Sequence, residues 1–441
     1  MKKTKNMKTL KQTYKILLVS LFMVTAINAS LSQERKESFE KIYKINSTGD
    51  VSFSCYETDL KVNTWDKDEV KLVGEIIIGG GDIKDQDELI EAFKNPDVSE
   101  SSNYLRIKTN LVQNTIIIGP FRKITLVNGK TIKVDKFEAK YTLWIPENIS
   151  FDLKSKYNDI DIATLKGDVK FELYEVDLTL ISFNKGEFNM KYSSAEIGKG
   201  ESAKFDVYEC ELEIKDIKKI MANTKYSDYF IGKSEILAVG SYEDDFDIIS
   251  LSKGLTGQAK YSDFKIASNV SQIKMDVYET DIEVLNVDVV EYSSKYSTLN
   301  AKNINTLKCN SLYEVKIYAD VVGKFSCEES KYDHIRFQKI TKAIHLPSTY
   351  ELELNIESVD VGFEKFYGDF KYGNVNLPLD QKTEFSLKFE TKYGDVDFPK
   401  NRLKITNMDF EDSKKLFLGQ TIDNPPCKIE FAAYDTNIDL E

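Results

Sequence analysis

The chain has 441 residues, of which 41% are hydrophobic and 30% are charged, and this composition excludes a disordered chain and a multi-span membrane protein. Its 72 acidic side chains outnumber its 60 basic ones, and six lysines lie within the first 32 residues, which contain no acid. The remainder therefore has 54 basic against 72 acidic side chains. Because no basic surface is left to meet phosphates, we expect no nucleic-acid partner.

Residues 1–32 have the features of a secretory signal peptide. The six lysines precede an apolar run from Ile16 to Ala26, and small residues follow from Ala29 onward. This order is typical of a signal peptide, and a run of about 11 residues is too short to span a bilayer comfortably. The first cysteine is Cys55, so no lipid anchor is expected at the new terminus. We expect export and no membrane span after cleavage, with an uncleaved anchor as the alternative.

Residues 33–150 are predicted to form an N-terminal β-rich capping region with insertions. Alternating strand patterns dominate it, and one short helix is predicted with Asp85 as its N-cap and Pro96 after its end. Gly129 marks a hairpin turn. We expect this region to cover the first coil of the repeat that follows, because an unpaired coil invites edge-to-edge aggregation.

From residue 151 to 400, a tyrosine recurs at nearly constant intervals. Eleven successive gaps lie between 16 and 19 residues, which chance does not produce. Two kinds alternate: a lysine precedes one kind and a glutamate follows the other, so the full repeat is about 35 residues long. The tyrosines are Tyr157, Tyr174, Tyr192, Tyr208, Tyr226, Tyr242, Tyr261, Tyr278, Tyr296, Tyr313, Tyr332, Tyr350, Tyr372 and Tyr393.

Apolar and polar residues alternate on both sides of each tyrosine, as in Ile160/Ile162 and in residues 273–277. A period of two with many β-branched and aromatic residues favours strands over helical repeats. A unit of 17–18 residues cannot bury its apolar side alone, but stacked units can. The sequence therefore predicts an all-β fold, a single-stranded parallel β-helix or β-solenoid, with two short strands and two turns per coil. An antiparallel β-roll is the alternative.

Stacking has an electrostatic consequence for the residues beside the tyrosines. If the tyrosines of successive coils lie above one another, a lysine before each would form a column of like charges about 4.8 Å apart. The sequence avoids this by alternating the two kinds of coil. We expect Lys260 to lie diagonally across from Glu243 or Glu279, so that the 35-residue repeat balances charge along the stack.

The tyrosines themselves have two interpretations. The first is a stacked aromatic ladder that packs coil on coil. The second is an exposed aromatic row that binds sugar rings or a partner strand. In the second interpretation, the ligand-binding residues are Tyr174, Tyr192, Tyr208, Tyr226, Tyr242, Tyr261, Tyr278, Tyr296 and Tyr313.

Residues 401–441 are predicted to supply strands that close the other end. Pro425 and Pro426 mark a loop before a last strand at 428–433. The predicted organisation is a signal peptide at 1–32, the capping region at 33–150, the solenoid at 151–400 and closing strands at 401–441.

Two of the five cysteines have a spacing that matches one coil. Cys309 and Cys327 are 18 residues apart, and each follows an apolar residue by two, so both are expected to point inward on adjacent coils. The pair is predicted to be either a disulfide or two buried thiols. No CxxC pair occurs, so no zinc site is expected.

No residue pattern indicates catalysis. The carboxylates beside the strands, such as Asp159/Asp161, Asp244/Asp245 and Asp395/Asp397, recur with the repeat, which favours a solvated face over a site. His334 and His345 fit no serine–histidine–aspartate order. We expect no catalytic residue, no metal and no cofactor, and hence no enzyme.

The combination resembles a known protein family. An apparent signal peptide leads to Val62–Val70, which contains Trp65-Asp66, then to Leu143–Pro146 and the reiterated tyrosine coils. This is similar to the adhesin-like β-solenoid proteins of Bacteroidota and other bacteria, a family of unknown function. Where the family has Ser-Gly-Asp-Val, this chain has Lys-Tyr-Ser-Asp, and among the repeat tyrosines only Tyr372 and Tyr393 precede a glycine. The resemblance implies a solenoid and supplies no catalytic residues.

Three hypotheses about function follow. The first is an exported, non-enzymatic solenoid that acts as an adhesin or as an interaction scaffold of the cell envelope, with an unknown protein or glycan partner. The second is a periplasmic component of envelope sensing, because relatives often accompany sigma and anti-sigma regulators. The third is a glycan-binding or glycan-active protein. Location in the periplasm or at the cell surface is expected in each case.

Overall fold

The computed structural model describes residues 34–109, 111–118, 121–411 and 413–441. The predicted signal peptide lies outside the described residues. The chain forms two compact units: one reaches Pro146 and includes Lys156–Asp159, and the other comprises Glu147–Ser155 and Ile160–Glu441. Within the described ranges, no helix has the length and apolar character needed to cross a membrane.

The first unit, here the N-terminal unit, is built on a mixed β-sheet. Strand β4 lies between β1 and β10 with antiparallel pairing, and β3 pairs with β10 in parallel. Strand β2 pairs in parallel with β6, which pairs antiparallel with β5. The strands are β1 (Arg35–Lys44), β2 (Asp50–Tyr56), β3 (Asp59–Trp65), β4 (Glu69–Gly79), β5 (Asp97–Ser101), β6 (Tyr104–Lys108) and β10 (Lys136–Pro146).

One helix, α2 (Ile83–Lys94), belongs to this unit, and it begins earlier than predicted. Its N-cap is Asp82, whose carboxylate accepts a hydrogen bond from the backbone N–H of Lys84, so the prediction of Asp85 was wrong. The reason is the preceding turn, in which Gly80 and Gly81 have φ values of 71° and 79° and redirect the chain directly into the helix.

A smaller antiparallel sheet lies in the same unit, with strand order β7 (Asn114–Ile118), β8 (Phe121–Thr125) and β9 (Thr131–Val134). Gly129, with φ at 83°, forms the turn between β8 and β9, as predicted. Paired residues share a face of the sheet, and one face contains Ile124, Ile132 and Val134, which are all fully buried.

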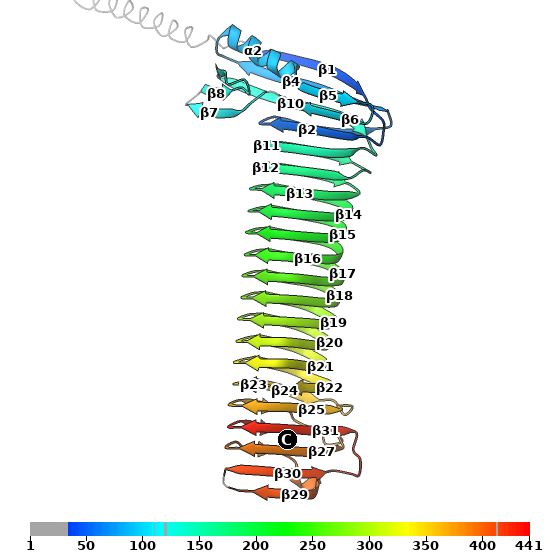
Figure 1. The fold of residues 1–441 in the computed structure, drawn as a ribbon, viewed down its shortest axis with the longest axis vertical. Helices are drawn as coiled ribbons and strands as arrows, with labels where there is room; N and C mark the ends of the chain where they lie inside the picture. The colour runs from blue at the N-terminus through cyan, green and yellow to red at the C-terminus, as the bar shows by residue number, and fades with distance from the viewer. Residues whose placement is uncertain (1–33, 110, 119–120, 412) are drawn as a thin grey trace, which may run out of the picture. The chain divides into compact units, whose positions relative to one another are not determined.

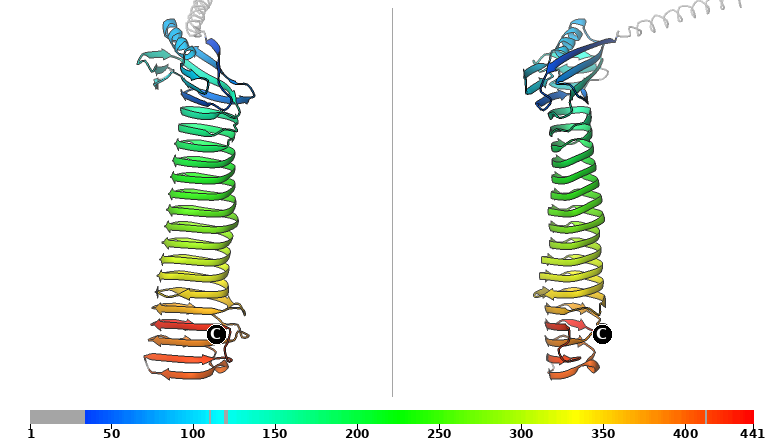
Figure 2. Two further views of the ribbon diagram at one scale, coloured as in Figure 1. Left: turned by 45° about the vertical axis from the view of Figure 1, so that its right-hand side comes forward. Right: turned by 90° about the vertical axis from the view of Figure 1, so that its right-hand side faces the viewer.

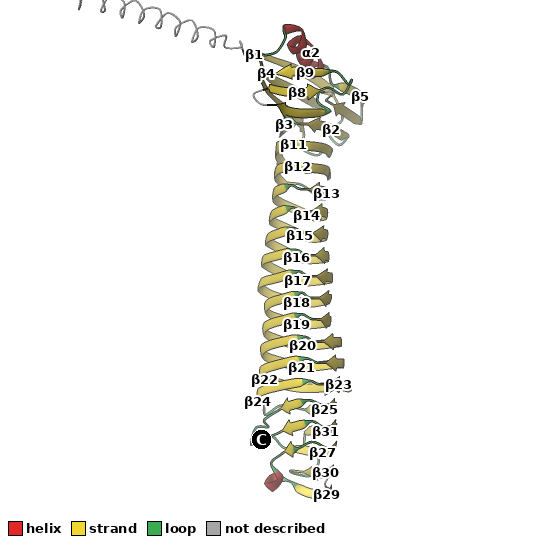
Figure 3. Cartoon of the chain, turned by 90° about the vertical axis from the view of Figure 1, so that its left-hand side faces the viewer, coloured by secondary structure: helices red, strands yellow, loops and turns green. Residues whose placement is uncertain are grey.

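The second unit, here the solenoid unit, confirms the predicted fold class. It is a parallel β-solenoid of about 13 turns, in which each strand pairs in register with the next (Figures 1 and 3). Its first twelve strands are β11 (Ser150–Thr164), β12 (Val169–Ser182), β13 (Lys185–Lys191), β14 (Ser194–Tyr208), β15 (Glu211–Lys225), β16 (Asp228–Tyr242), β17 (Asp245–Lys260), β18 (Asp263–Tyr278), β19 (Asp281–Lys295), β20 (Thr298–Tyr313), β21 (Lys316–Lys331) and β22 (His334–Leu346).

From β14 to β21, each coil is one long strand, and the prediction of two strands and two turns is wrong there; it holds between Tyr157 and Tyr192, where each coil contains two strands. In β15, Leu212 and Ile214 are buried at a spacing of two, Ile217 follows after three residues, and Ile220 after three more. The wider spacing around Ile217 marks a corner where the strand changes direction while its hydrogen bonds continue. The alternating pattern in the sequence predicts the strand on each side of the corner. It does not show that strand pairing continues through the corner.

A left-handed residue separates one regular coil from the next. Its φ lies between 45° and 60°, and it is the tyrosine in Lys-Tyr coils and the glutamate in Tyr-Glu coils, for example Tyr226 and Glu243. The tyrosine therefore shifts by one position from coil to coil. This shift produces the alternately shorter and longer tyrosine gaps in the sequence.

At the carboxyl end, the chain doubles back into its own stack. Strand β31 (Cys427–Tyr434), which the sequence predicted, inserts in parallel between β25 (Lys365–Lys371) and β27 (Phe385–Lys392) (Figure 1). The sheet ends with β30 (Lys414–Gln420) and β29 (Lys404–Phe410), which pair antiparallel (Figure 2). The remaining elements are β23 (Thr349–Tyr350), β24 (Glu353–Val359), β26 (Asn374–Asn376), β28 (Val396–Asp397), the 3-10 helix η1 (Lys400–Arg402) and β32 (Asn437–Asp439).

Candidate functional site

The tyrosines line one edge of the solenoid, but not in a single column. Tyr242 is in register with Lys225 and Lys260, so each tyrosine of the Tyr-Glu kind lies between two lysines. The prediction that the tyrosines lie directly above one another was therefore wrong. They form a zigzag across two adjacent columns, because the left-handed residue alternates between tyrosine and glutamate.

This zigzag is a continuous ladder of aromatic contacts. Neighbouring ring centroids are 5.3–5.7 Å apart, and the rings meet edge to face at 63–84°. Such pairs contribute about 0.5–1.5 kcal/mol each beyond burial of area. The tyrosine ladder consists, in spatial order, of Tyr174, Tyr192, Tyr208, Tyr226, Tyr242, Tyr261, Tyr278, Tyr296, Tyr313, Tyr332, Tyr350, Tyr372, Tyr434 and Tyr393.

The ladder is also a surface. From Tyr192 to Tyr372, the tyrosines of the Lys-Tyr kind are 37–44% exposed, and those of the Tyr-Glu kind are half-buried. A hydrogen bond with the adjacent glutamate raises the pKa of Tyr208, Tyr242 and Tyr278, with burial as a second cause. The ladder therefore presents neutral phenols at regular intervals to a partner while the rings hold one another in place.

A column of buried hydroxyl groups fixes this edge from the inside. The Ser227 hydroxyl donates to the carbonyl of Lys225 at 2.9 Å and accepts the N–H of Cys210 at 3.1 Å. The same pattern recurs one or more coils away, because the residue after each left-handed residue points inward. Its hydroxyl members are Ser193, Ser227, Ser262, Thr280, Ser297 and Thr436.

Two aspartates replace hydroxyl groups in this column. Asp244 accepts hydrogen bonds from the Ser227 N–H at 2.9 Å and the Ser241 hydroxyl at 2.6 Å. Asp333 accepts from the Val315 N–H at 2.8 Å and is fully buried. Burial raises the pKa of both carboxyls, to about 6 for Asp333, although their hydrogen bonds oppose the shift.

The predicted diagonal placement of charges beside the ladder is found, but it produces no ion pair between the described side chains. Glu243 is the diagonal neighbour of Lys260, but these two described side chains form no ion pair. Ion pairs between neighbouring coils lie elsewhere, at the corner between Lys218 and Glu201 at 2.6 Å and on a flank between Lys274 and Glu291 at 2.9 Å. Next to the ladder, carboxylates follow one another in register on five successive coils: Glu211, Asp228, Asp245, Asp263 and Asp281.

The cysteine pair and the two histidines noted in the sequence lie in the solenoid unit. Cys309 and Cys327 are in register on adjacent coils, and both are buried free thiols. His334 lies on the surface beside Glu353, with 2.6 Å between its Nδ1 and a carboxylate oxygen, and His345 stacks on Tyr367. No group of three or more metal-ligating side chains occurs in the part of the chain that the structure describes.

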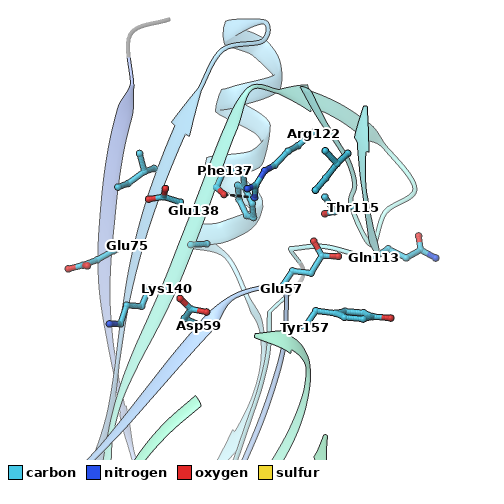
Figure 4. A pocket seen from close by; sticks show the side chains of 13 residues that line it. Glu57, Asp59, Glu75, Gln113, Thr115, Arg122, Phe137, Glu138, Lys140 and Tyr157 are labelled. Carbon is cyan, nitrogen blue, oxygen red and sulfur yellow. Dashed lines mark hydrogen bonds between the residues drawn. The ribbon is translucent and has the colours of Figure 1, made fainter. Parts of the chain in front are cut away.

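A second candidate site is a cleft of about 910 Å³ in the N-terminal unit (Figure 4). It lies between the face of the main sheet that carries Glu75, Ile77 and Glu138 and the inner face of the small sheet. Where Ile124 packs, that face is fully buried, but Ile117 on the same face is 70% exposed. The Thr115 hydroxyl is buried there and has no hydrogen-bond partner among the described residues. The two layers therefore separate toward β7 and leave the cleft open.

The cleft has an acidic lining. Four carboxylates outnumber two basic groups, and the Arg122 guanidinium already donates to the carbonyl of Phe137 at 3.1 Å. Neither Glu57 nor Glu75 forms an ion pair with a described residue. The charged lining residues are Glu57, Asp59, Glu75, Glu138, Arg122 and Lys140.

Sequence reasoning missed this cleft because its walls come from strands far apart in the chain. The alternating patterns of residues 33–150 predicted strands in this region, but the pairing of β7 with β8 and the open cleft are tertiary properties. The available signal was the run of three isoleucines at 116–118, which a strand with one solvent-facing side does not need.

Comparisons with known proteins add little. No protein-family model matches the chain, and no curated protein matches it. Among solved structures, it matches a putative cell adhesion protein from Clostridium sporogenes, with 8% identity over 92% of this chain and 100% of that chain. The TM-score is 0.18, which is too low to establish a common fold. Membership of the adhesin-like family stays a prediction.

Proposed function

We propose that the chain is an exported, non-enzymatic interaction scaffold that acts as an adhesin or within the cell envelope, and that the tyrosine ladder is its contact surface. The observation that supports this best is the unbroken ladder of partly exposed rings from Tyr174 to Tyr393. A rigid row of aromatic rings offers large contact area with little loss of side-chain freedom on binding.

The ladder suits an elongated partner. About 13 coils at roughly 4.8 Å give a row about 60 Å long, so a polymer or strand could contact several rings at once. Such repeated weak contacts add up when they are geometrically compatible. A glycan chain or an extended protein surface satisfies this requirement, whereas a small substrate does not.

A triple variant tests the ladder directly. Tyr226→Asn, Tyr261→Asn and Tyr296→Asn remove three exposed rings, and asparagine tolerates the left-handed conformation of these positions. The matched control replaces Met221, Ile249 and Leu285, which are equally exposed but lie outside the ladder, with serine. Sedimentation with chitin, cellulose and peptidoglycan sacculi measures binding. We expect at least tenfold loss for the ladder variant and no loss for the control; equal behaviour of both variants, or no binding by the parent chain, contradicts the proposal.

Location is a separate experiment. Protease is added to intact cells and to cells with a permeabilised outer membrane, and cleavage of the chain is followed by immunoblot. Cleavage in intact cells supports adhesion. Protection until permeabilisation supports a periplasmic scaffold or sensor.

A further inference from the structure

We propose that the free edge of β7 in the N-terminal unit binds an extended segment of a partner protein that contains lysine or arginine. This site is independent of the tyrosine ladder. The partner segment would add a strand to the small sheet and place alternate side chains in the acidic cleft.

The first observation is the edge itself. Strand β7 pairs with β8 and with no other strand in the described part of the chain, so one side of its backbone is open for hydrogen bonding. It presents Ile116, Ile117 and Ile118, which are 46%, 70% and 56% exposed. Edge strands are normally protected by charges, prolines or coverage, because an apolar edge pairs readily with other chains. An unprotected apolar edge is suited to strand addition.

The second observation is the shape of the cleft. Side chains of an added strand alternate, so every second residue would continue the inner row of Thr115 and Ile117. Across the opening, that row faces the side of the main sheet that carries Glu75, Ile77 and Glu138. Apolar side chains of the segment would fill the space that Ile117 leaves open, and a hydroxyl or amide could reach the unpartnered Thr115 hydroxyl.

The third observation is charge. Glu57 and Glu75 line the cleft and form no ion pair with a described residue, although Lys140 is the cross-strand neighbour of Glu75. Arg122 is held by a backbone carbonyl. Figure 4 shows Glu57 and Asp59 in the lower part of the view, with the Glu57 carboxylate pointing up toward Thr115. A basic side chain on the inner face of the segment would reach these carboxylates. Complementary charge favours a lysine- or arginine-containing segment over an acidic one.

The test uses the purified chain and fluorescein-labelled eight-residue peptides that repeat two valines and two lysines, or two valines and two glutamates, so that each face carries both valine and a charged side chain. Fluorescence anisotropy is expected to show binding of the valine–lysine peptide and at least tenfold weaker binding of the valine–glutamate peptide. In two further valine–lysine peptides, every second backbone nitrogen is methylated: the odd-numbered ones in one peptide and the even-numbered ones in the other. Because only one of these two sets donates to β7, one of the peptides should lose binding and the other retain it.

Variants identify the site. Ile117→Thr, and separately Glu57→Gln with Glu75→Gln, should weaken the valine–lysine peptide at least fivefold. The matched controls on the solenoid surface, Ile249→Thr and Glu196→Gln with Glu213→Gln, should not. Circular dichroism checks that each variant folds.

Four results would overturn the proposal: no binding of the valine–lysine peptide, equal binding of both methylated peptides, equal weakening by site and control variants, or a dimer that Ile117→Thr dissolves. The last result, measured by light scattering, would assign the edge to a second copy of the chain. None of these results bears on the tyrosine ladder.

Discussion

The two units expose apolar side chains in contrasting ways. In the solenoid unit, the exposed tyrosines repeat coil after coil, and each ring packs against two others. In the N-terminal unit, the exposed isoleucines at 116–118 occur once, on an edge strand without a cover. Repetition lets an exposed aromatic ring contribute to stability, so exposure there does not by itself indicate a ligand. Exposure without such contacts is the stronger sign of a missing partner.

The units also differ in how far the loss of stability caused by a substitution should extend from its site. Each solenoid coil contacts only its neighbours, so its stability is close to a sum of similar local contributions. In the N-terminal unit, α2, β4 and β10 share one core around Phe93 and Tyr141, whose ring centroids are 4.9 Å apart. The predictions below use substitutions that separate these behaviours.

The largest effect is expected inside the solenoid. Phe246 stacks between Tyr229 and Phe264, with centroids 4.6 Å from each, and is almost fully buried. Phe246→Ala should destabilise the chain by about 3–5 kcal/mol, because it leaves a cavity between coils. Urea unfolding measures the change, and hydrogen exchange should show the loss concentrated in β16 to β18. Phe230→Ala, at an exposed position of the same region, is the control and should change little.

A pH-dependent effect is expected from Asp333. Its folded pKa of about 6 exceeds the ordinary value of 3.8, so the folded chain holds the proton more tightly than the unfolded chain. Its contribution to stability is therefore greatest below pH 4 and falls by about 3 kcal/mol as the pH rises through 6. In Asp333→Ser, which introduces at this position the residue found two coils away at Ser297, this fall should disappear. Urea unfolding between pH 4 and 7 compares the two chains, and parallel pH profiles would show that Asp333 does not titrate as described.

The repeat made most of the solenoid predictable. A spacing of two at positions such as Ile160 and Ile162 identified strands, and tyrosine gaps of 16–19 identified coils. The column assignment failed because it assumed that identical residues stack, whereas the backbone aligns left-handed residues and places Tyr242 between lysines. The insertion of β31 beside β25 and the open cleft could not be predicted, since both depend on pairing between segments without a repeated pattern.

A smaller loss is expected from the hydroxyl column. Ser262 accepts the N–H of Asp244 at 3.2 Å and donates to the carbonyl of Lys260 at 2.9 Å, all within the buried edge. Ser262→Ala leaves a buried N–H without a partner and should cost about 1–2 kcal/mol. Ser252→Ala, on the exposed surface, is the matched control. A loss for Ser262→Ala no greater than for this control would mean that water replaces the hydroxyl and that the column does not stabilise the edge.

The smallest effect is expected at the cleft, and it distinguishes the two units most directly. Ile117→Thr should change the free energy of unfolding by less than about 0.5 kcal/mol, because the side chain is 70% exposed and packs against little. Ile124→Ala, on the same face of the same sheet but fully buried, should cost about 2–5 kcal/mol. If urea unfolding gave similar losses for both, Ile117 would be part of the core and the cleft would be closed in solution. A large difference would mean that the isoleucine is kept exposed at no benefit to folding, which leaves binding as its physical purpose.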